Sequence, residues 1–452
     1  MDFDKALHSN RVVLDSGIKD ATILIKNGKI VQLVAGKLPS EALGERTVTE
    51  LGHAVIMPGI IDAHVHINEP GRSEWEGFET ATRAAAAGGV TTLIEMPLNA
   101  SPVTTTVANF EKKQSAAAGK LQVNCGFYGG LIPGNFADLP DLMQAGVFGI
   151  KCFLTHSGID DFPNVTESDL AKAMPLIEKT GLPLLVHAEL DAPHPMAAWF
   201  KNHPTHYPAY LKSRPKSWEN NAIELMLRLC KNTRCRTHIV HLSSADLLGR
   251  LQKAKQSLPL SVETAPHYLY FHAEAIPDAQ TVYKCAPPIR ESANNALLWQ
   301  GLKAGVIDFI GSDHSPAPPA LKEIASGNLS KAWGGISGLQ FTLPVVWSKA
   351  QALGFEPEDI ARWLCSRPAD FLGLSQKGRI EVGNDADLTV WEPETTFTVL
   401  EKDILHRHKI TPYLGEKLQG KVMQTWVAGE QVFGEGGILK ENQGQVLLKG
   451  KF

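Results

Sequence analysis

Four histidines, one lysine and one aspartate stand at the ends of apolar segments along this sequence, or inside them. Runs of Val, Ile, Leu and Phe of this kind are typical of buried strands. The six residues are His64 and His66 in IIDAHVH, Lys151 in FGIKCFL, His187 in PLLVHAE, His241 in HIVHLSS and Asp313 in FIGSDHS. Because alternate side chains of a strand point to the same face, His64 and His66 should point together with Asp62.

This set predicts a binuclear metal site. Histidines and a carboxylate suit a borderline divalent ion such as zinc, and they are too many for one catalytic zinc with an open position. Two ions need an anionic bridge, which Lys151 can supply if its neutral amine has captured carbon dioxide as a carbamate. Two dications offset by carbamate, aspartate and hydroxide leave about one positive charge, enough to polarise a carbonyl group in a metal hydrolase. The alternative is that each residue is structural, with the lysine amine reaching the surface.

The middle of the chain alternates apolar strands with segments of helical composition, such as 76–89 and 218–232. The candidate strands are 56–66, 90–97, 121–130, 148–154, 183–189, 236–243, 258–265 and 307–313. Eight strands favour an α/β fold closed into a (β/α)8 TIM-like barrel over an open doubly wound sheet, and barrel enzymes react where strands meet the following loops. The sequence lacks a dinucleotide fingerprint, a P-loop and a G-x-S-x-G motif at these ends, which argues against the corresponding chemistries.

At both ends of the chain, apolar and polar residues alternate as in an antiparallel sheet. Asn27-Gly28 and Ala428-Gly429 are typical two-residue hairpin turns between alternating strands. We therefore expect residues 1–55 and 380–452 to form one small flanking β-sandwich domain. Residues 56–379 are expected to form the catalytic barrel.

Composition excludes several classes of partner. The 452 residues are 43% hydrophobic and 20% charged, and their net charge of -4 gives no electrostatic reason to expect nucleic acid or an anionic membrane. The sequence has no apolar run of about 20 residues, and its first residues lack the pattern of a signal peptide. Its six cysteines form no C-x-x-C pair, so we expect reduced thiols and a cytoplasmic protein.

Together these residues resemble the cyclic amidases of the amidohydrolase superfamily, which include dihydroorotases, hydantoinases and allantoinases. The resemblance covers nearly the whole chain. It implies that two divalent ions, with zinc expected, are bound by His64, His66, Lys151 as N6-carboxylysine, His187, His241 and Asp313. His241 is chosen over His238 because it directly precedes Leu242-Ser243-Ser244, as in the family's H-[IL]-S-S. The resemblance also implies an oligomer, with a homotetramer expected.

Narrower motifs resemble allantoinases in particular. They are INEPGRSEWEG (67–77), EMPLN (95–99), ETAPHY (263–268), KCAPPIR (284–290), SDHSPAPP (312–319) and KAWGGISGLQ (331–340). Dihydroorotases usually carry an arginine where this chain has Asn68, and hydantoinases carry a tyrosine where it has His156. Whether His156 takes over the tyrosine's role stays open.

The resemblance implies a small-molecule cyclic ureide substrate and hydrolysis of the cyclic amide of allantoin to allantoate, a step of purine and ureide catabolism. A hydroxide bridging the metals would attack the ring carbonyl, and catalytic Asp313 would move its proton to the leaving nitrogen. Substrate contacts are expected from Asn68, Asn99, Cys285 and Gly335, although Asn99 could instead only form a turn. The alternatives are a hydantoinase, dihydropyrimidinase or dihydroorotase acting on another cyclic imide, and a catalytically inactive scaffold.

Overall fold

Parallel strands surround the centre of the molecule in the computed structural model, which describes residues 2–39, 41 and 46–450. The barrel strands are β6 (Ile60–Val65), β7 (Val90–Glu95), β8 (Asn124–Phe127) with its continuation β9 (Gly129–Gly130), β10 (Ile150–Phe153), β11 (Leu184–His187), β12 (Thr237–Ile239), β13 (Leu260–Thr264) and β14 (Phe309–Ile310). Each falls within one of the eight predicted segments. The predicted α/β barrel is confirmed.

The barrel closes between its first and last strands. Strands β6 to β8 and β9 to β14 pair in sequence order and in parallel. Past β14, His314 bridges Val65 in parallel, and its carbonyl oxygen accepts a hydrogen bond of 2.8 Å from the His66 amide. This contact brings the segment that carries Asp313 beside the two histidines that follow β6.

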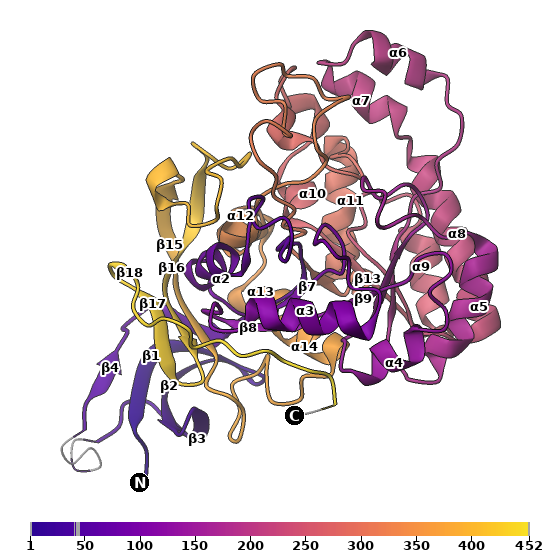
Figure 1. Cartoon of the computed structure of the whole chain (residues 1–452). Helices are drawn as coiled ribbons and strands as arrows, with labels where there is room; N and C mark the ends of the chain where they lie inside the picture. The colour runs from indigo at the N-terminus through magenta and orange to yellow at the C-terminus, as the bar shows by residue number, and fades with distance from the viewer. Residues whose placement is uncertain (1, 40, 42–45, 451–452) are drawn as a thin grey trace.

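Helices surround the barrel on the outside (Figure 1). They include α2 (Phe78–Ala87), α3 (Val107–Ala117), α4 (Leu139–Gln144), α5 (Glu167–Glu178), α8 (Lys216–Thr233), α9 (Leu248–Lys255), α11 (Ser292–Lys303), α12 (Thr342–Ala350), α13 (Pro357–Ala361) and α14 (Arg367–Leu372). Three more follow strand ends: α6 (Met196–Asn202), α7 (Tyr207–Ser213) and α10 (Pro266–Tyr270). In the described chain, no helix combines the length and the apolar character needed to cross a membrane.

The flanking sheet contains strands from both ends of the chain. These are β1 (Lys5–Leu14), β2 (Gly17–Lys26), β3 (Lys29–Ala35), β4 (Val48–Glu50), β5 (Val55–Pro58), β15 (Leu388–Thr398), β16 (Lys417–Val427), β17 (Glu430–Gly434) and β18 (Gly437–Ile438). Their order is β18-β17-β16-β15-β5-β1-β2-β3, with β4 beside β1. Residues 1, 40, 42–45 and 451–452 of the predicted terminal segments lie outside the described residues. The exact domain boundaries stay predictions.

Both predicted hairpin turns are present, and they touch each other. Asn27 and Gly28 have φ values of 50° and 76°, while Ala428 and Gly429 have φ values of 47° and 73°. All four residues are therefore left-handed, as a type I′ turn requires. A Cβ atom at Gly28 would lie 2.8 Å from the Ala428 carbonyl oxygen, so only glycine fits between the turns.

The predicted strand 56–66 is instead two strands, which is a correction to the sequence analysis. Strand β5 pairs with β15 and β1 of the flanking sheet, whereas β6 pairs with β7 of the barrel. The chain crosses from one sheet to the other at Gly59, where a Cβ atom would lie 2.2 Å from Thr91 Oγ1. Both halves are buried and apolar, so composition alone did not reveal the change of partner.

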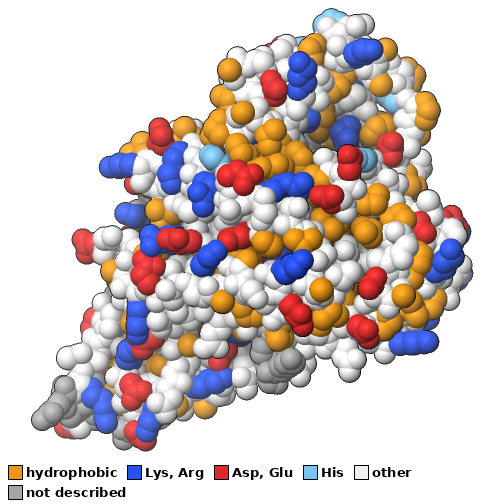
Figure 2. Space-filling model, in the orientation of Figure 1, with side chains coloured by type: hydrophobic (Ala, Val, Ile, Leu, Met, Phe, Trp, Pro, Cys, Tyr) orange, Lys and Arg blue, Asp and Glu red, His pale blue; other side chains and the backbone are white. Residues whose placement is uncertain are grey.

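The last described residues return to the barrel. Val446 bridges Cys125 of β8 in parallel, and the Lys449 amide donates to the Gly146 carbonyl at 2.8 Å. Figure 1 shows this segment running beneath α3 toward the carboxyl terminus. On the face shown in Figure 2, charged side chains of both signs are interspersed, as expected from the small net charge.

Candidate active site

The six predicted metal ligands meet at the carboxyl end of the barrel. All six line one cavity of about 480 Å³. Lys151 and His187 lie on β10 and at the end of β11, and the other four lie on β6 or just beyond a strand end. Sequence reasoning therefore identified a group of side chains that the fold does bring together.

On one side of the cavity, Asp313 lies between the two histidines of the H-x-H pair. Its Oδ1 atom is 3.3 Å from His64 Nε2 and 3.6 Å from His66 Nε2. Candidate ligand atoms of these three residues all lie within 4.8 Å of one another. Burial raises the pKa of the Asp313 carboxyl group above its ordinary value.

On the other side, two histidines face each other directly. His187 Nδ1 and His241 Nε2 are 2.9 Å apart. The ring centroids of His241 and His64 are 5.4 Å apart, so the two halves of the site are adjacent. His238 lies elsewhere: its Nδ1 atom is 2.8 Å from Ser261 Oγ, its ring stacks on Phe309, and it does not line the cavity.

Lys151 is fully buried beside both histidine groups. Its Nζ atom has no hydrogen-bond partner among the described residues and lies 5.0 Å from the centroid of the Phe153 ring. Burial lowers the pKa of this amine to about 8, which favours the neutral form that can react with carbon dioxide.

These side chains fit a pair of divalent ions. Buried polar atoms rarely lack a hydrogen-bond partner, yet His64 Nε2 and Lys151 Nζ have none within the described chain, although Asp313 Oδ1 lies 3.3 Å from the former. Four histidine nitrogens and a carboxylate oxygen converge on one cavity, and two of these nitrogens, His187 Nδ1 and His241 Nε2, are 2.9 Å apart. This donor set suits zinc or a similar ion.

Two carboxylates that sequence reasoning missed orient the histidines. Glu263 accepts a hydrogen bond from His64 Nδ1 and lies 3.1 Å from His238 Nε2, which leaves His64 Nε2 to face the cavity. Glu189 Oε2 lies 2.8 Å from His187 Nε2, which leaves His187 Nδ1 to face His241. Such partners fix the tautomer and the orientation of ligand histidines. Their only sequence signal was an acidic residue close to a strand end.

Charge pairing keeps both carboxylates ionised. Burial alone would raise the pKa of Glu189, but Arg214 and His187 outweigh it and bring the value to about 2. Burial would likewise raise the pKa of Glu263, and its two histidine partners bring it to about 2. Arg214 holds Glu189 through two hydrogen bonds, at 3.2 and 2.5 Å.

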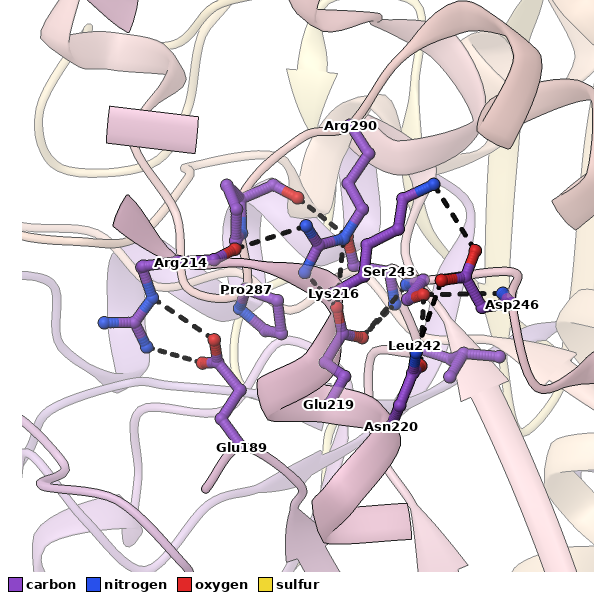
Figure 3. Close-up of polar contacts among 12 residues, drawn as sticks. Glu189, Arg214, Lys216, Glu219, Asn220, Leu242, Ser243, Asp246, Pro287 and Arg290 are labelled. Carbon is purple, nitrogen blue, oxygen red and sulfur yellow. Dashed lines mark hydrogen bonds and ion pairs between the residues drawn. The ribbon is translucent and has the colours of Figure 1, made fainter. Parts of the chain in front are cut away.

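A buried ion pair holds the segment after His241 (Figure 3). Glu219 Oε1 accepts hydrogen bonds of 3.0 Å from the amides of Ser243 and Ser244, while Glu219 Oε2 accepts one of 3.0 Å from Arg290 Nε. His241 itself has a φ of 37°, a left-handed value that costs energy for a residue with a Cβ atom. The ion pair therefore stabilises a strained ligand position.

Arg290 also contacts the residue that supports His187. Arg290 Nη1 donates to the Arg214 carbonyl oxygen at 3.3 Å, and the Arg214 side chain holds Glu189 beneath His187. Figure 3 shows Arg290 between the Arg214 carbonyl and Glu219. Through Arg290, Glu189 beside His187 and Glu219 behind His241 thus belong to one network of polar contacts.

The four predicted substrate residues divide into two groups. Asn99, Cys285 and Gly335 line the cavity. Asn68 is fully buried, donates to the Pro316 carbonyl at 3.3 Å, and is not among the residues that line the cavity. His156 lines the cavity with its side chain 59% exposed, and its Nδ1 atom accepts a hydrogen bond of 3.1 Å from the Gly158 amide.

Comparisons with known proteins agree with this geometry. The allantoinase of Streptomyces avermitilis is 45% identical over 439 residues, which cover 96% of each chain. The allantoinase of Arabidopsis thaliana is 44% identical over 95% of this chain and 88% of its own. Among solved structures, the L-hydantoinase (dihydropyrimidinase) of Arthrobacter aurescens superimposes with a TM-score of 0.91 at 31% identity, covering 99% of this chain and 100% of that one. The model of the amidohydrolase family matches residues 55–432, and the chain belongs to this family.

Proposed function

We propose that this protein hydrolyses the cyclic amide bond of allantoin to give allantoate. The observation that carries the proposal is the complete six-residue set around one cavity, in a chain 45% identical to an allantoinase over nearly its whole length. An inactive scaffold would have no need to retain all six side chains.

The site is proposed to hold two divalent ions, with zinc expected. His64 and His66 would bind one ion, His187 and His241 the other, and Lys151 as N6-carboxylysine would contact both, with Asp313 beside the first pair. When bound, such ions polarise a carbonyl oxygen and make water a stronger nucleophile. The unpartnered, buried amine of Lys151 supports its carboxylation.

Asp313 is proposed to move the proton that the reaction requires. Water adds across the ring amide: its oxygen bonds to the carbonyl carbon, the carbon–nitrogen bond breaks, and one proton passes to the leaving nitrogen. Asp313 is buried at the wall of the cavity, and its pKa is raised by that burial, so its carboxylate is a competent base. The substrate's planar imide offers donors and acceptors in alternation, which Asn99 and the backbone around Cys285 and Gly335 can match.

A hydantoinase or dihydropyrimidinase activity is the second candidate. It is favoured by the TM-score of 0.91 to the L-hydantoinase of Arthrobacter aurescens. The identity of 31% to that protein is lower than the 45% to an allantoinase, and His156 stands where hydantoinases carry a tyrosine.

A homotetramer in the cytoplasm is also proposed. The six cysteines are buried and free, which supports a reducing compartment. Light scattering on the purified protein would test the assembly, since a monomer would contradict it.

A substrate panel tests the proposed activity. Allantoin, hydantoin, dihydrouracil and dihydroorotate are each supplied to the protein loaded with zinc, and the kcat/KM values are compared. We expect allantoin to be preferred and dihydroorotate to react poorly, because Asn68 stands where dihydroorotases have an arginine for the substrate carboxylate. An unpaired charge in a partly dehydrated pocket costs about 2–5 kcal/mol, or roughly thirtyfold to several thousandfold. Equal kcat/KM values for these two substrates would overturn the allantoin assignment and leave a cyclic amidase.

A further inference from the structure

Lys322 carries a buried amino group that the reaction itself does not use. It lies in the loop between β14 and α12, and only 4% of its surface is exposed. Its Nζ atom donates to three backbone carbonyl oxygens: Lys284 at 3.1 Å, Trp333 at 3.1 Å and Gly335 at 2.6 Å. In its ammonium form this group has three N–H donors, one for each of these carbonyl oxygens.

Burying this charge is unfavourable in itself. Burial lowers the pKa of Lys322 to about 7, and no carboxylate contributes to its environment in the part of the chain that the structure describes. Hydrogen bonds to carbonyl groups offset only part of the cost of removing a charge from water. A methionine of similar length would fill the same space without that cost, but it would leave the three carbonyl groups without this donor.

The three carbonyl groups belong to two loops of the cavity wall. Lys284 to Ala286 form part of one wall, and Ser330 to Gly335 form another part. The loops also contact each other, because the Gly335 amide donates to the Lys284 carbonyl at 2.9 Å. Lys322 therefore cross-links the two loops from behind the cavity wall.

The direction of these carbonyl groups determines the direction of the neighbouring amides. In a trans peptide the C=O and N–H bonds point in opposite directions. When the carbonyls of Lys284 and Trp333 point at Lys322, the amides of Cys285 and Gly334 point away from it. Neither amide has an acceptor within the described residues, and both residues line the cavity.

We propose that Lys322 is a positioning residue for substrate binding, which holds the Cys285 and Gly334 amides so that they donate to a carbonyl oxygen of the cyclic ureide. This inference rests on the proposed function for the identity of the substrate. In this role Lys322 contributes to the protein's affinity for the substrate ring and takes no part in metal binding or proton transfer.

The test compares Lys322→Met with the wild type, both loaded with metal. Methionine keeps the length of the side chain and removes all three donors. Loss of one or two well-aligned hydrogen bonds to substrate should raise the KM for allantoin by about tenfold or more, with kcat changed much less. The metal content should stay at the wild-type value, whereas the thermal midpoint should fall, because three carbonyl groups lose their common donor. Lys303→Met, on the exposed side of α11, is the matched control and should leave every value unchanged.

An unchanged KM in Lys322→Met, with metal retained, would overturn the inference. A lower thermal midpoint with unchanged KM would assign Lys322 a purely structural role and would overturn it too. If the wild type cleaves another cyclic amide but not allantoin, the proposed function fails, and the same KM comparison with that substrate still decides the role of Lys322.

A second measurement does not depend on the variant's folding. Amide hydrogen exchange of the wild-type holoenzyme is followed by mass spectrometry with and without saturating hydantoin. Protection of peptides that contain Cys285 and Gly334 is the expected result. Exchange that hydantoin does not slow in either peptide would contradict the inference.

Discussion

His187 Nδ1 and His241 Nε2 lie 2.9 Å apart, although the two residues are 54 positions apart in the chain. Their strands, β11 and β12, are neighbours in the barrel, and each histidine is supported by a buried carboxylate on its far side or behind its backbone. Without a metal, the two facing nitrogens can share only one proton. Their supports therefore hold both rings in an orientation that suits binding of a cation.

Glu189→Gln should weaken metal binding without removing a ligand. The amide keeps the shape of the side chain but loses the charge that orients His187 and pairs with Arg214. Partners of this kind typically contribute about 10–100-fold to metal affinity. Competition with a chelator, followed by metal analysis, measures the change. Glu224→Gln, at an exposed pair with Arg250, is the control, and equal metal retention in both variants would refute the role of Glu189.

Lys151→Ala should lose both metals or most of the activity, because the proposed carbamate is the only bridge that the protein supplies. Short carboxylic acids added to this variant should restore part of the turnover by replacing the missing bridge. Metal analysis and allantoin assays with and without acetate make the measurement. Two bound metals and full activity in Lys151→Ala would exclude the carbamate.

Asp313→Asn should keep at least part of its metal and lose turnover by several orders of magnitude. The amide still offers an oxygen ligand but cannot accept a proton, and a general base alone typically contributes about 10²–10⁴-fold. Steady-state kinetics on a metal-matched sample provide the readout. Activity within about tenfold of the wild type would point to another base, with His314 or His267 as the buried candidates.

Arg290→Met should destabilise the protein and loosen the His241 segment. It leaves the Glu219 carboxylate buried and unpaired, which typically costs about 3–5 kcal/mol. Urea denaturation and metal analysis follow the two effects. The double variant Glu219→Gln with Arg290→Met should recover part of the stability, because the amide oxygen can still accept from Ser243 and Ser244 without a buried charge. A double variant less stable than Arg290→Met would contradict this explanation.

The sequence by itself determined the barrel, the two hairpin turns and the six residues around the cavity. Strand periodicity and apolar runs are local properties, and parallel strands of a closed barrel necessarily place their carboxyl ends at one rim. Hence His64, Lys151, His187 and Asp313 could be assigned to one site before their distances were known.

Only the tertiary structure decided which groups support these ligands and where the sheets divide. The contacts of Glu263 with His64, of Glu219 with the Ser243 amide and of Lys322 with the Lys284 carbonyl join residues that are 199, 24 and 38 positions apart. No local pattern encodes such partners, because an acidic or basic residue near a strand end is equally compatible with solvent. The change of sheet at Gly59 was hidden for the same reason: both strands are apolar and buried, and only their hydrogen-bond partners distinguish them.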